Sequence, residues 1–258
     1  MTIVPKKGYG QHFLADPNIL EVIGRLAEPA PSDVVLEIGP GLGALTRYLA
    51  DRVELVHAVE VDRSLAQRLE AAVDGRTNVR ILWGDAMRLD LAALEPAPTK
   101  LVANLPYNVA TPIVVESLDG LPSVVEWTVM VQREVADRFF AKPRTKAYGA
   151  VSVLLQLATD RTGLHPVSRT VFRPPPNVDS ALVAFRRRDL PEDYRGLKRL
   201  VEAAFAHRRK TLPNSLELAG AASRQHAAAA LESLGRPTNV RAEELAPGEY
   251  VVLRDALA

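Results

Sequence analysis

Cysteine is absent from this chain of 258 residues. Its absence excludes disulfide bonds, thiolate metal sites and a cysteine nucleophile, and it suits a protein of the reducing cytoplasm. No other pattern in the sequence supports a metal site. We therefore expect a cytoplasmic protein that holds no metal.

Long hydrophobic runs are also absent. No segment approaches the roughly 20 apolar residues that a membrane-spanning helix requires, and residues 1–7 lack the apolar core of a signal peptide. Hydrophobic residues nevertheless make up 47% of the chain, which is enough to bury one large core, alone or with a small appended domain. We expect a globular protein that is neither exported nor bound to a membrane.

The net charge is only +1, but the charges are unevenly distributed. Residues 1–132 contain 11 Lys and Arg against 17 Asp and Glu, whereas residues 133–214 contain 17 against 8. Clustered cations gain affinity for a polyanion because they displace counterions from its phosphates. The basic segment therefore fits a nucleic-acid surface, although a solvated face would fit it equally well.

Short apolar segments alternate with helical patterns in the first part of the chain. Leucines recur at helical spacing in residues 42–52 and 64–73. Alternation of this kind predicts an α/β fold, with a mostly parallel sheet covered by helices. The predicted strands are residues 34–38, 55–61, 79–83, 100–103 and 128–131.

The pattern changes toward the end of the chain. A helix is predicted over residues 147–158, and late strands over 160–167 and 180–186 flank a loop whose three prolines exclude a helix. Beyond about residue 190 the apolar spacing is helical throughout. We therefore predict a first domain over residues 1–189 and a small all-helical domain over residues 190–258, with helical segments at 197–205, 219–234 and 243–257.

A glycine-rich turn, residues 37–43, ends the first strand and opens a helix. Glycines let a ligand approach the backbone, and the free N–H groups at a helix start can hold an anion. Gly39, Gly41 and Ala44 satisfy the loose dinucleotide pattern, and Glu60 at the end of the second strand could bind ribose hydroxyls. The turn alone does not distinguish the pyrophosphate of NAD from the carboxylate of S-adenosylmethionine (SAM).

Asp85 and Asn104 narrow this choice because they follow the third and fourth strands. The carboxyl ends of strands are where open α/β sheets bind ligands. Asp85 can accept a hydrogen bond from the amino group of an adenine, although a helix N-cap would use the same residue. With Glu60 on the ribose and the turn at Gly39 on the methionine end, these residues favour SAM.

Asn104-Leu105-Pro106-Tyr107 is the most specific short motif in the chain. The Asn104 side-chain oxygen and a main-chain carbonyl of Leu105 or Pro106 can both accept hydrogen bonds from one NH₂ group, while Tyr107 offers a stacking face. With both hydrogens engaged, the lone pair of the nitrogen can face a methyl donor, so the transfer depends on positioning. Phe172 could close the other face of a flipped base, or it could be a core aromatic.

In these motifs the chain resembles the KsgA family of small-subunit ribosomal RNA adenine dimethyltransferases, over essentially its whole length. The resemblance implies a Rossmann-like class I SAM-dependent methyltransferase sheet with a helical C-terminal domain. It implies dimethylation of N6 on two adjacent adenines in the 3′-terminal hairpin of 16S rRNA, within a partly assembled 30S subunit, and a role in assembly of that subunit. The matching segments are residues 10–14, 37–43, 84–86, 104–108, 132–136, 148–150, 172–180 and 208–212.

The resemblance also implies roles for individual residues. The SAM site would comprise His12, Leu14, Gly39, Gly41, Glu60, Asp85 and Asn104. The target adenine would be held by Asn104, Pro106, Tyr107 and Phe172. Candidate RNA contacts are Arg133, Arg186, Arg187, Arg188, Arg208, Arg209 and Lys210. Pro213 stands where the family often has a basic residue, which predicts one phosphate contact fewer, and we expect a monomer.

Three alternatives remain open at this point. An Erm-type enzyme would methylate an adenine of large-subunit rRNA with the same fold. A non-catalytic RNA-binding assembly factor would retain the scaffold without the chemistry, against which the intact motifs argue. An NAD-dependent oxidoreductase would explain the glycine turn, but it leaves residues 104–107 and the basic segment without a purpose.

Overall fold

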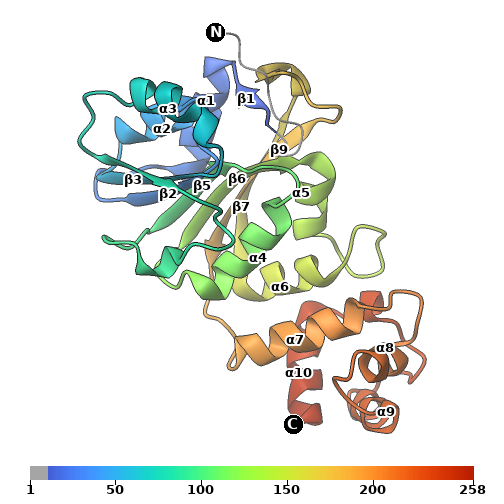
Figure 1. Ribbon diagram of the computed structural model, residues 1–258. Helices are drawn as coiled ribbons and strands as arrows, with labels where there is room; N and C mark the ends of the chain where they lie inside the picture. Colours follow the sequence, from blue (N-terminus) through green and yellow to red (C-terminus); the bar gives the residue numbers. More distant parts are fainter. Residues whose placement is uncertain (1–10) are drawn as a thin grey trace. The chain divides into compact units, whose positions relative to one another are not determined.

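The computed structural model describes residues 11–258 (Figure 1). Gly10 and residues 1–7, on which the resemblance and the absence of a signal peptide partly rest, lie outside the described residues. The chain forms two compact units. The first contains the residues up to Ala136 together with Arg161–Arg187, and the second contains Asp137–Asp160 and Arg188–Ala258. Residues 137–160 thus group with the C-terminal helices, whereas the predicted boundary after residue 189 placed them in the first domain.

A seven-stranded sheet with strand order β4-β3-β2-β5-β6-β9-β7 forms the centre of the α/β fold. The strands β2 to β6 pair in parallel, and β9 pairs antiparallel to β6. All residues of β2 and β3 are buried, as expected for a sheet covered on both faces. The bounds are β2 Val34–Ile38, β3 Leu55–Glu60, β4 Val79–Trp83, β5 Lys100–Asn104, β6 Glu126–Gln132, β7 Thr159–Val167 and β9 Ser180–Arg187. The predicted α/β class is confirmed.

Helices cover both faces of this sheet. On one face, α1 (Pro17–Ala27) and α2 (Ala44–Ala50) share a core cluster with Met130 of β6. Trp127 lies three residues earlier on β6, so its side chain points to the opposite face. There its indole N–H donates a hydrogen bond of 2.9 Å to the Ser117 hydroxyl of α4, which spans Ala110–Gly120.

The remaining elements of the first unit are short. A 3-10 turn at Arg63–Leu65 leads into α3 (Ala66–Ala72), and α5 (Arg133–Phe139) begins directly after β6. The two-residue strands β1 (Phe13–Leu14) and β8 (Phe172–Arg173) pair antiparallel, with Leu14 opposite Phe172. This pairing brings the N-terminal segment beside the proline-rich loop, 158 positions later in the chain.

The second unit is all helical, with buried tyrosines that satisfy their hydroxyl groups. The Tyr148 hydroxyl donates to the carbonyl of Leu245 at 2.8 Å, and that of Tyr250 to Ala242 at 2.7 Å. Pro213 is buried in the first turn of α8, where its missing N–H removes no helical hydrogen bond. The helices are α6 Ala150–Ala158, α7 Tyr194–Phe205, α8 Leu212–Leu218, α9 Arg224–Ser233 and α10 Pro247–Leu257.

Lys100 anchors the amino edge of the sheet. Its ammonium group lies 3.1 Å from the carboxylate of Asp33 and 2.8 Å from that of Glu126, and it donates to the carbonyls of Ala27 and Glu28 at the end of α1. The side chain is only 9% exposed. Burial of this charge is therefore compensated by two carboxylates and two carbonyls, which join α1, β2 and β6.

Replacing Lys100 by alanine is expected to lower the free energy of unfolding by about 3–5 kcal/mol, because it leaves two carboxylates without their buried partner. Urea denaturation would measure this change. Arg186→Ala is the matched control, since Arg186 pairs with the same Glu126 from a side chain that is 59% exposed. It should cost less than about 1 kcal/mol. Equal losses for the two variants would show that the buried lysine has no special role.

No helix within residues 11–258 is both long and apolar enough to cross a membrane.

Candidate active site

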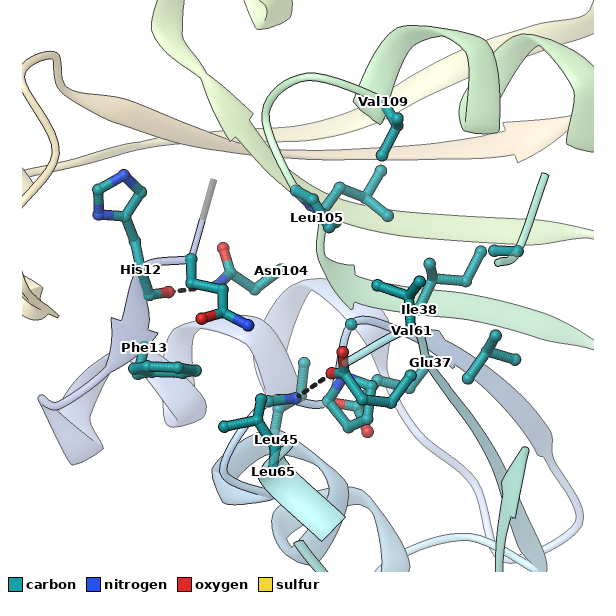
Figure 2. Close-up of a pocket in the computed structure, with 18 of the residues that line it drawn as sticks. His12, Phe13, Glu37, Ile38, Leu45, Val61, Leu65, Asn104, Leu105 and Val109 are labelled. Carbon is teal, nitrogen blue, oxygen red and sulfur yellow. Dashed lines mark hydrogen bonds between the residues drawn. The ribbon is translucent and has the colours of Figure 1, made fainter. Parts of the chain in front are cut away.

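A cavity in the first unit lies where the parallel strands end. It is lined by residues from the N-terminal segment and from the segments that follow β2, β3, β4 and β5 (Figure 2). Every residue predicted to bind the cofactor lines it, namely His12, Leu14, Gly39, Gly41, Glu60, Asp85 and Asn104. Pro106 and Tyr107 line the same cavity, so the structure brings the two predicted sites together.

The glycine turn has the backbone that its glycines permit. Gly39 and Gly41 have φ values of +78° and +59°, in the left-handed region that side chains disfavour. A Cβ on Gly41 would lie 3.0 Å from the Phe13 ring, and one on Gly39 would lie 3.4 Å from Pro106. The turn therefore approaches both the N-terminal segment and the segment after β5 closely.

Glu60 fastens this turn to the end of β3. One carboxylate oxygen accepts from the N–H of Gly41 at 3.0 Å and the other from the N–H of Asp62 at 2.8 Å (Figure 2). Burial raises the pKa of Glu60, and the N–H groups of Asp62 and Gly41 oppose this shift. Glu60 therefore positions the glycine turn in addition to any contact with a ribose.

Asp85 follows β4, the neighbour of β3 in the sheet, and is exposed where it lines the cavity. Its carboxylate accepts from the N–H of Met87 at 2.9 Å and lies 3.6 Å from the guanidinium of Arg88. The residues after Asp85 form a turn. Asp85 thus caps this turn, which does not continue as a helix, and contact of Asp85 with an adenine stays a prediction.

Two adjacent residues of the N-terminal segment are bonded to residues that follow different strands at the cavity. The side-chain amide of Gln11 donates to the carboxylate of Asp62 at 2.8 Å. The side-chain amide of Asn104 donates to the carbonyl of His12 at 3.1 Å (Figure 2). These bonds tie the segment to the residues that follow β3 and β5. A ligand in the cavity would thus be enclosed by chain segments that are far apart in the sequence.

The side-chain oxygen of Asn104 is the atom of the site that points most directly to a ligand. Because the nitrogen donates to His12, the orientation of the amide is set, and the oxygen Oδ1 is buried without a hydrogen-bond partner among the described residues. Buried acceptors without a partner are rare because desolvation is costly. This oxygen is therefore suited to accept a hydrogen bond from a ligand.

Three aromatic rings meet beside Asn104. The His12 ring lies 5.5 Å from the Tyr107 ring and 6.5 Å from the Phe172 ring, and its Nδ1 lies 2.9 Å from the carbonyl of Pro174. Phe172 is fully buried, belongs to the core cluster and does not line the cavity. In this arrangement Phe172 is a core aromatic, and contact with a target base stays a prediction that requires His12 to move.

Sequence reasoning assigned no role to two further residues of the cavity. Val61 is 43% exposed despite being apolar, and it offers a flat contact beside Glu60. Glu37 is a fully buried carboxyl in a strand that is otherwise apolar, and one of its oxygens has no hydrogen-bond partner in the part of the chain that the structure describes. An acidic residue inside such a strand was the signal that could have identified it.

Burial raises the pKa of Glu37 to about 8, while the nearby Thr46 hydroxyl lowers it and Glu60 raises it further. Glu37 is therefore mainly protonated at neutral pH in this structure. The folded protein binds this proton more tightly than the unfolded chain does, since the ordinary pKa is 4.5. The resulting stabilisation is complete below the unfolded pKa and is lost as the pH rises through the folded pKa.

We therefore expect Glu37→Gln to remove this contribution to the pH dependence of stability. The free energy of unfolding of the parent protein, relative to that of Glu37→Gln, should fall between about pH 5 and about pH 9. Urea denaturation at several pH values measures the difference. Parallel pH profiles for the two proteins would contradict the protonated state of Glu37.

The candidate RNA contacts of the first unit lie at two different edges of the sheet. Arg133 is exposed at the carboxyl end of β6, near the cavity edge. Arg186 lies opposite Glu126 at the amino edge and pairs with its carboxylate. The guanidinium of Arg187 donates to the carbonyls of Leu118, Leu121 and Val124. Arg187 therefore holds the end of α4, and the structure argues against Arg186 and Arg187 as RNA contacts beside the cavity.

The other basic candidates belong to the second unit. Arg188 lies 3.6 Å from the carboxylate of Asp160. Arg208, Arg209 and Lys210 are exposed in the turn after α7. The Arg208 guanidinium donates to the carbonyl of Tyr148 at 3.2 Å, so the turn adjoins the basic loop at residues 142–146. Contact of these residues with RNA stays a prediction.

The fold and the cavity together are those of a class I SAM-dependent methyltransferase. A glycine turn after the first parallel strand, an acidic residue after the second and ligand-binding residues at the carboxyl ends are features that this class shares with other Rossmann-like folds, and the solved structures that the chain is similar to are methyltransferases. The crystal structure of the 23S rRNA methyltransferase ErmE is similar over 95% of this chain and 99% of its own, with a TM-score of 0.68 and 29% identity. A dimethyladenosine transferase from Plasmodium falciparum has the same fold, with a TM-score of 0.78, 24% identity and coverage of 94% and 96%.

Within this class, the family model described as ribosomal RNA adenine dimethylase matches residues 4–251. Ribosomal RNA small subunit methyltransferase A of Rubrobacter xylanophilus is 51% identical over 96% of this chain and 94% of its own length. The enzyme of that name from Thermobifida fusca is 44% identical, with coverage of 96% and 88%. The chain therefore belongs to the ribosomal RNA adenine dimethylase family, and SAM is its cofactor.

Proposed function

We propose that this protein dimethylates N6 of two adjacent adenines in the 3′-terminal hairpin of 16S rRNA, within a partly assembled 30S subunit. The observation that carries the proposal is the buried side-chain oxygen of Asn104, a residue that lines the cavity, because this oxygen has no hydrogen-bond partner among the described residues. An exocyclic amine would supply the hydrogen that this acceptor lacks. The choice of the small subunit is supported by relatives that are named for it and cover nearly the whole chain.

The chemistry assigned to this site is methyl transfer by direct displacement. Bound SAM supplies an electrophilic methyl group on its sulfonium sulfur. Asn104 Oδ1 would accept one hydrogen of the adenine amine, and a carbonyl of Leu105 or Pro106 would accept the other. These two acceptors would orient the N6 lone pair toward the methyl group of SAM, and N6 would release its extra proton to solvent as the methyl group is transferred. The site thus contributes orientation and water exclusion, and it needs no strong base.

Recognition of the RNA would use both units of the protein. We assign phosphate contacts to Arg133 and to Arg208, Arg209 and Lys210, which are exposed. A cation that contacts a phosphate contributes affinity without sequence information, so these residues would position the hairpin. Selection of the adenine itself would come from residues 104–107. We further propose that the enzyme is a monomer and that it acts in the cytoplasm.

The test uses purified protein, tritiated SAM and two RNA substrates. One substrate is the 30S subunit from a strain that lacks this methylation, and the other is protein-free large-subunit rRNA. The proposal expects label in the 30S subunit, recovered as dimethyladenine. Label confined to large-subunit rRNA would establish the Erm-type alternative, for which the likeness to ErmE is the supporting observation. No label in either substrate would favour a non-catalytic assembly factor.

A further inference from the structure

Ser180 is a buried hydroxyl that touches the proposed target-base site. Its Oγ lies 2.6 Å from the phenolic oxygen of Tyr107, and the residue has no exposed surface. Tyr107 lines the cavity and is half-buried. The two hydroxyls come from positions 73 residues apart, so only the folded chain brings them together.

The position of Ser180 is set by the sheet. It is the first residue of β9, where it pairs with Gln132 at the end of β6. Just before it, the carbonyl of Asp179 accepts from the N–H of Arg133 at 3.0 Å. Because β6 lies between β5 and β9 in the sheet, the bond from Tyr107 to Ser180 passes over the end of β6. A rigid strand therefore holds one partner of the hydrogen bond, while the other follows the proline turn after β5.

The state of the phenol suits this role. Burial raises the pKa of Tyr107, with the Ser180 hydroxyl lowering it and the nearby Asp179 charge raising it. The phenol consequently keeps its proton at neutral pH, and either hydroxyl can be the donor. Contact between the His12 and Tyr107 rings, at 5.5 Å, restrains the same side chain from its face.

We propose that Ser180 is a positioning residue for methyl transfer, whose hydroxyl holds the Tyr107 ring in the place where the target adenine stacks. The inference rests on the proposed function, in which Tyr107 supplies the stacking face. A ring held at its hydroxyl cannot swing about the Cα–Cβ bond, and contact with the His12 ring opposes rotation of the ring plane, so the amine of a stacked base keeps one position relative to Asn104. Loss of the Ser180 hydroxyl would leave the ring present but free to swing.

The test is a double-mutant cycle on methylation of 30S subunits that lack the modification, with SAM at saturation. Ser180→Ala and Tyr107→Phe should each lower kcat about three- to tenfold, the size of one neutral hydrogen bond, with KM for the subunit nearly unchanged. The double variant should be no slower than the slower single variant, because both changes remove the same bond. Multiplied losses, or full activity of either single variant, would overturn the inference.

Ser117→Ala is the matched control. Ser117 is also a buried serine that bonds to an aromatic side chain, the indole of Trp127, but it lies on α4 and does not line the cavity. Its loss should reduce the thermal midpoint without changing kcat, whereas a purely structural role of Ser180 would give the same result as this control.

Tyr107→Ala separates failure of this inference from failure of the proposed function. An inactive Tyr107→Ala variant beside a normal Ser180→Ala variant would reject only the positioning role of Ser180. Full activity of Tyr107→Ala would reject the stacking face itself, and with it both proposals for this residue. The thermal midpoint and the affinity for SAM are measured for every variant, so a folding defect is detected directly.

Discussion

Asn104→Ala should lower kcat for methyl transfer by about 10²–10³-fold while SAM still binds. Asn104 Oδ1 is buried and has no partner within residues 11–258, so its removal deletes an acceptor that is suited to a ligand. The amine of the target base would then keep only one of its two hydrogen bonds to the protein, and it would reach the methyl donor in many orientations. Single-turnover methylation of 30S subunits and calorimetric titration with SAM measure the two effects separately.

Asn78→Ala is the matched control for Asn104→Ala. Asn78 is likewise partly buried and donates through its amide to the carbonyls of Ala50 and Val53, but it lies at the amino end of β4, away from the cavity. Its loss should cost stability and leave turnover intact. Loss of SAM binding in Asn104→Ala would instead show that the bond from Asn104 to the carbonyl of His12 holds the cofactor. Unchanged turnover would disprove the amine trap.

Glu60→Ala is expected to reduce the affinity for SAM by at least about 100-fold. The substitution leaves the N–H groups of Gly41 and Asp62 without acceptors, at a cost of about 1–3 kcal/mol for each buried group. It also frees the glycine turn and removes the carboxylate assigned to the ribose. Isothermal titration with SAM measures the affinity, and methylation at saturating SAM shows whether the chemical step survives.

Two variants calibrate the result for Glu60. Glu54→Ala removes an exposed carboxylate just before β3, at the end of the strand away from the cavity, and should leave the affinity unchanged. Glu60→Gln keeps one acceptor but turns an NH₂ group toward a backbone N–H, so its affinity should lie between those of the parent and Glu60→Ala. An affinity of Glu60→Ala equal to that of the parent would refute a role for this carboxylate in the cofactor site.

Much of the sheet could be predicted because its strands are locally encoded. Five strands read as short apolar runs, four of them largely buried and β4 partly buried at the sheet edge, and each was located to within about two residues. The helices were predicted less completely, and α1, α4, α5 and α8 were missed. In α4, a proline and several β-branched residues obscure the helical spacing. Packing of its apolar side chains against the sheet overrides this weak local preference.

The residues of the cofactor cavity could also be predicted, because the rule that locates them is topological. The carboxyl ends of parallel strands meet at one edge, so residues that follow successive strands become neighbours. The same reasoning fails for β9, since hydropathy does not reveal the direction of a strand. Its antiparallel course places Arg186 and Arg187 at the amino edge, opposite the end that carries Ser180. The basic segment is therefore not one continuous surface.

The sequence by itself determined which chemical groups are available to this protein. Short motifs identified a glycine turn, an acceptor for an amine and a stacking ring, because these depend on residues that are adjacent in the chain. Only the tertiary structure decided which partners those groups have. The contact of His12 with Phe172, the bond of Tyr107 to Ser180 and the unpartnered oxygen of Asn104 all depend on segments separated by more than 70 residues. Such partners are selected by strand direction and packing, which no local pattern records.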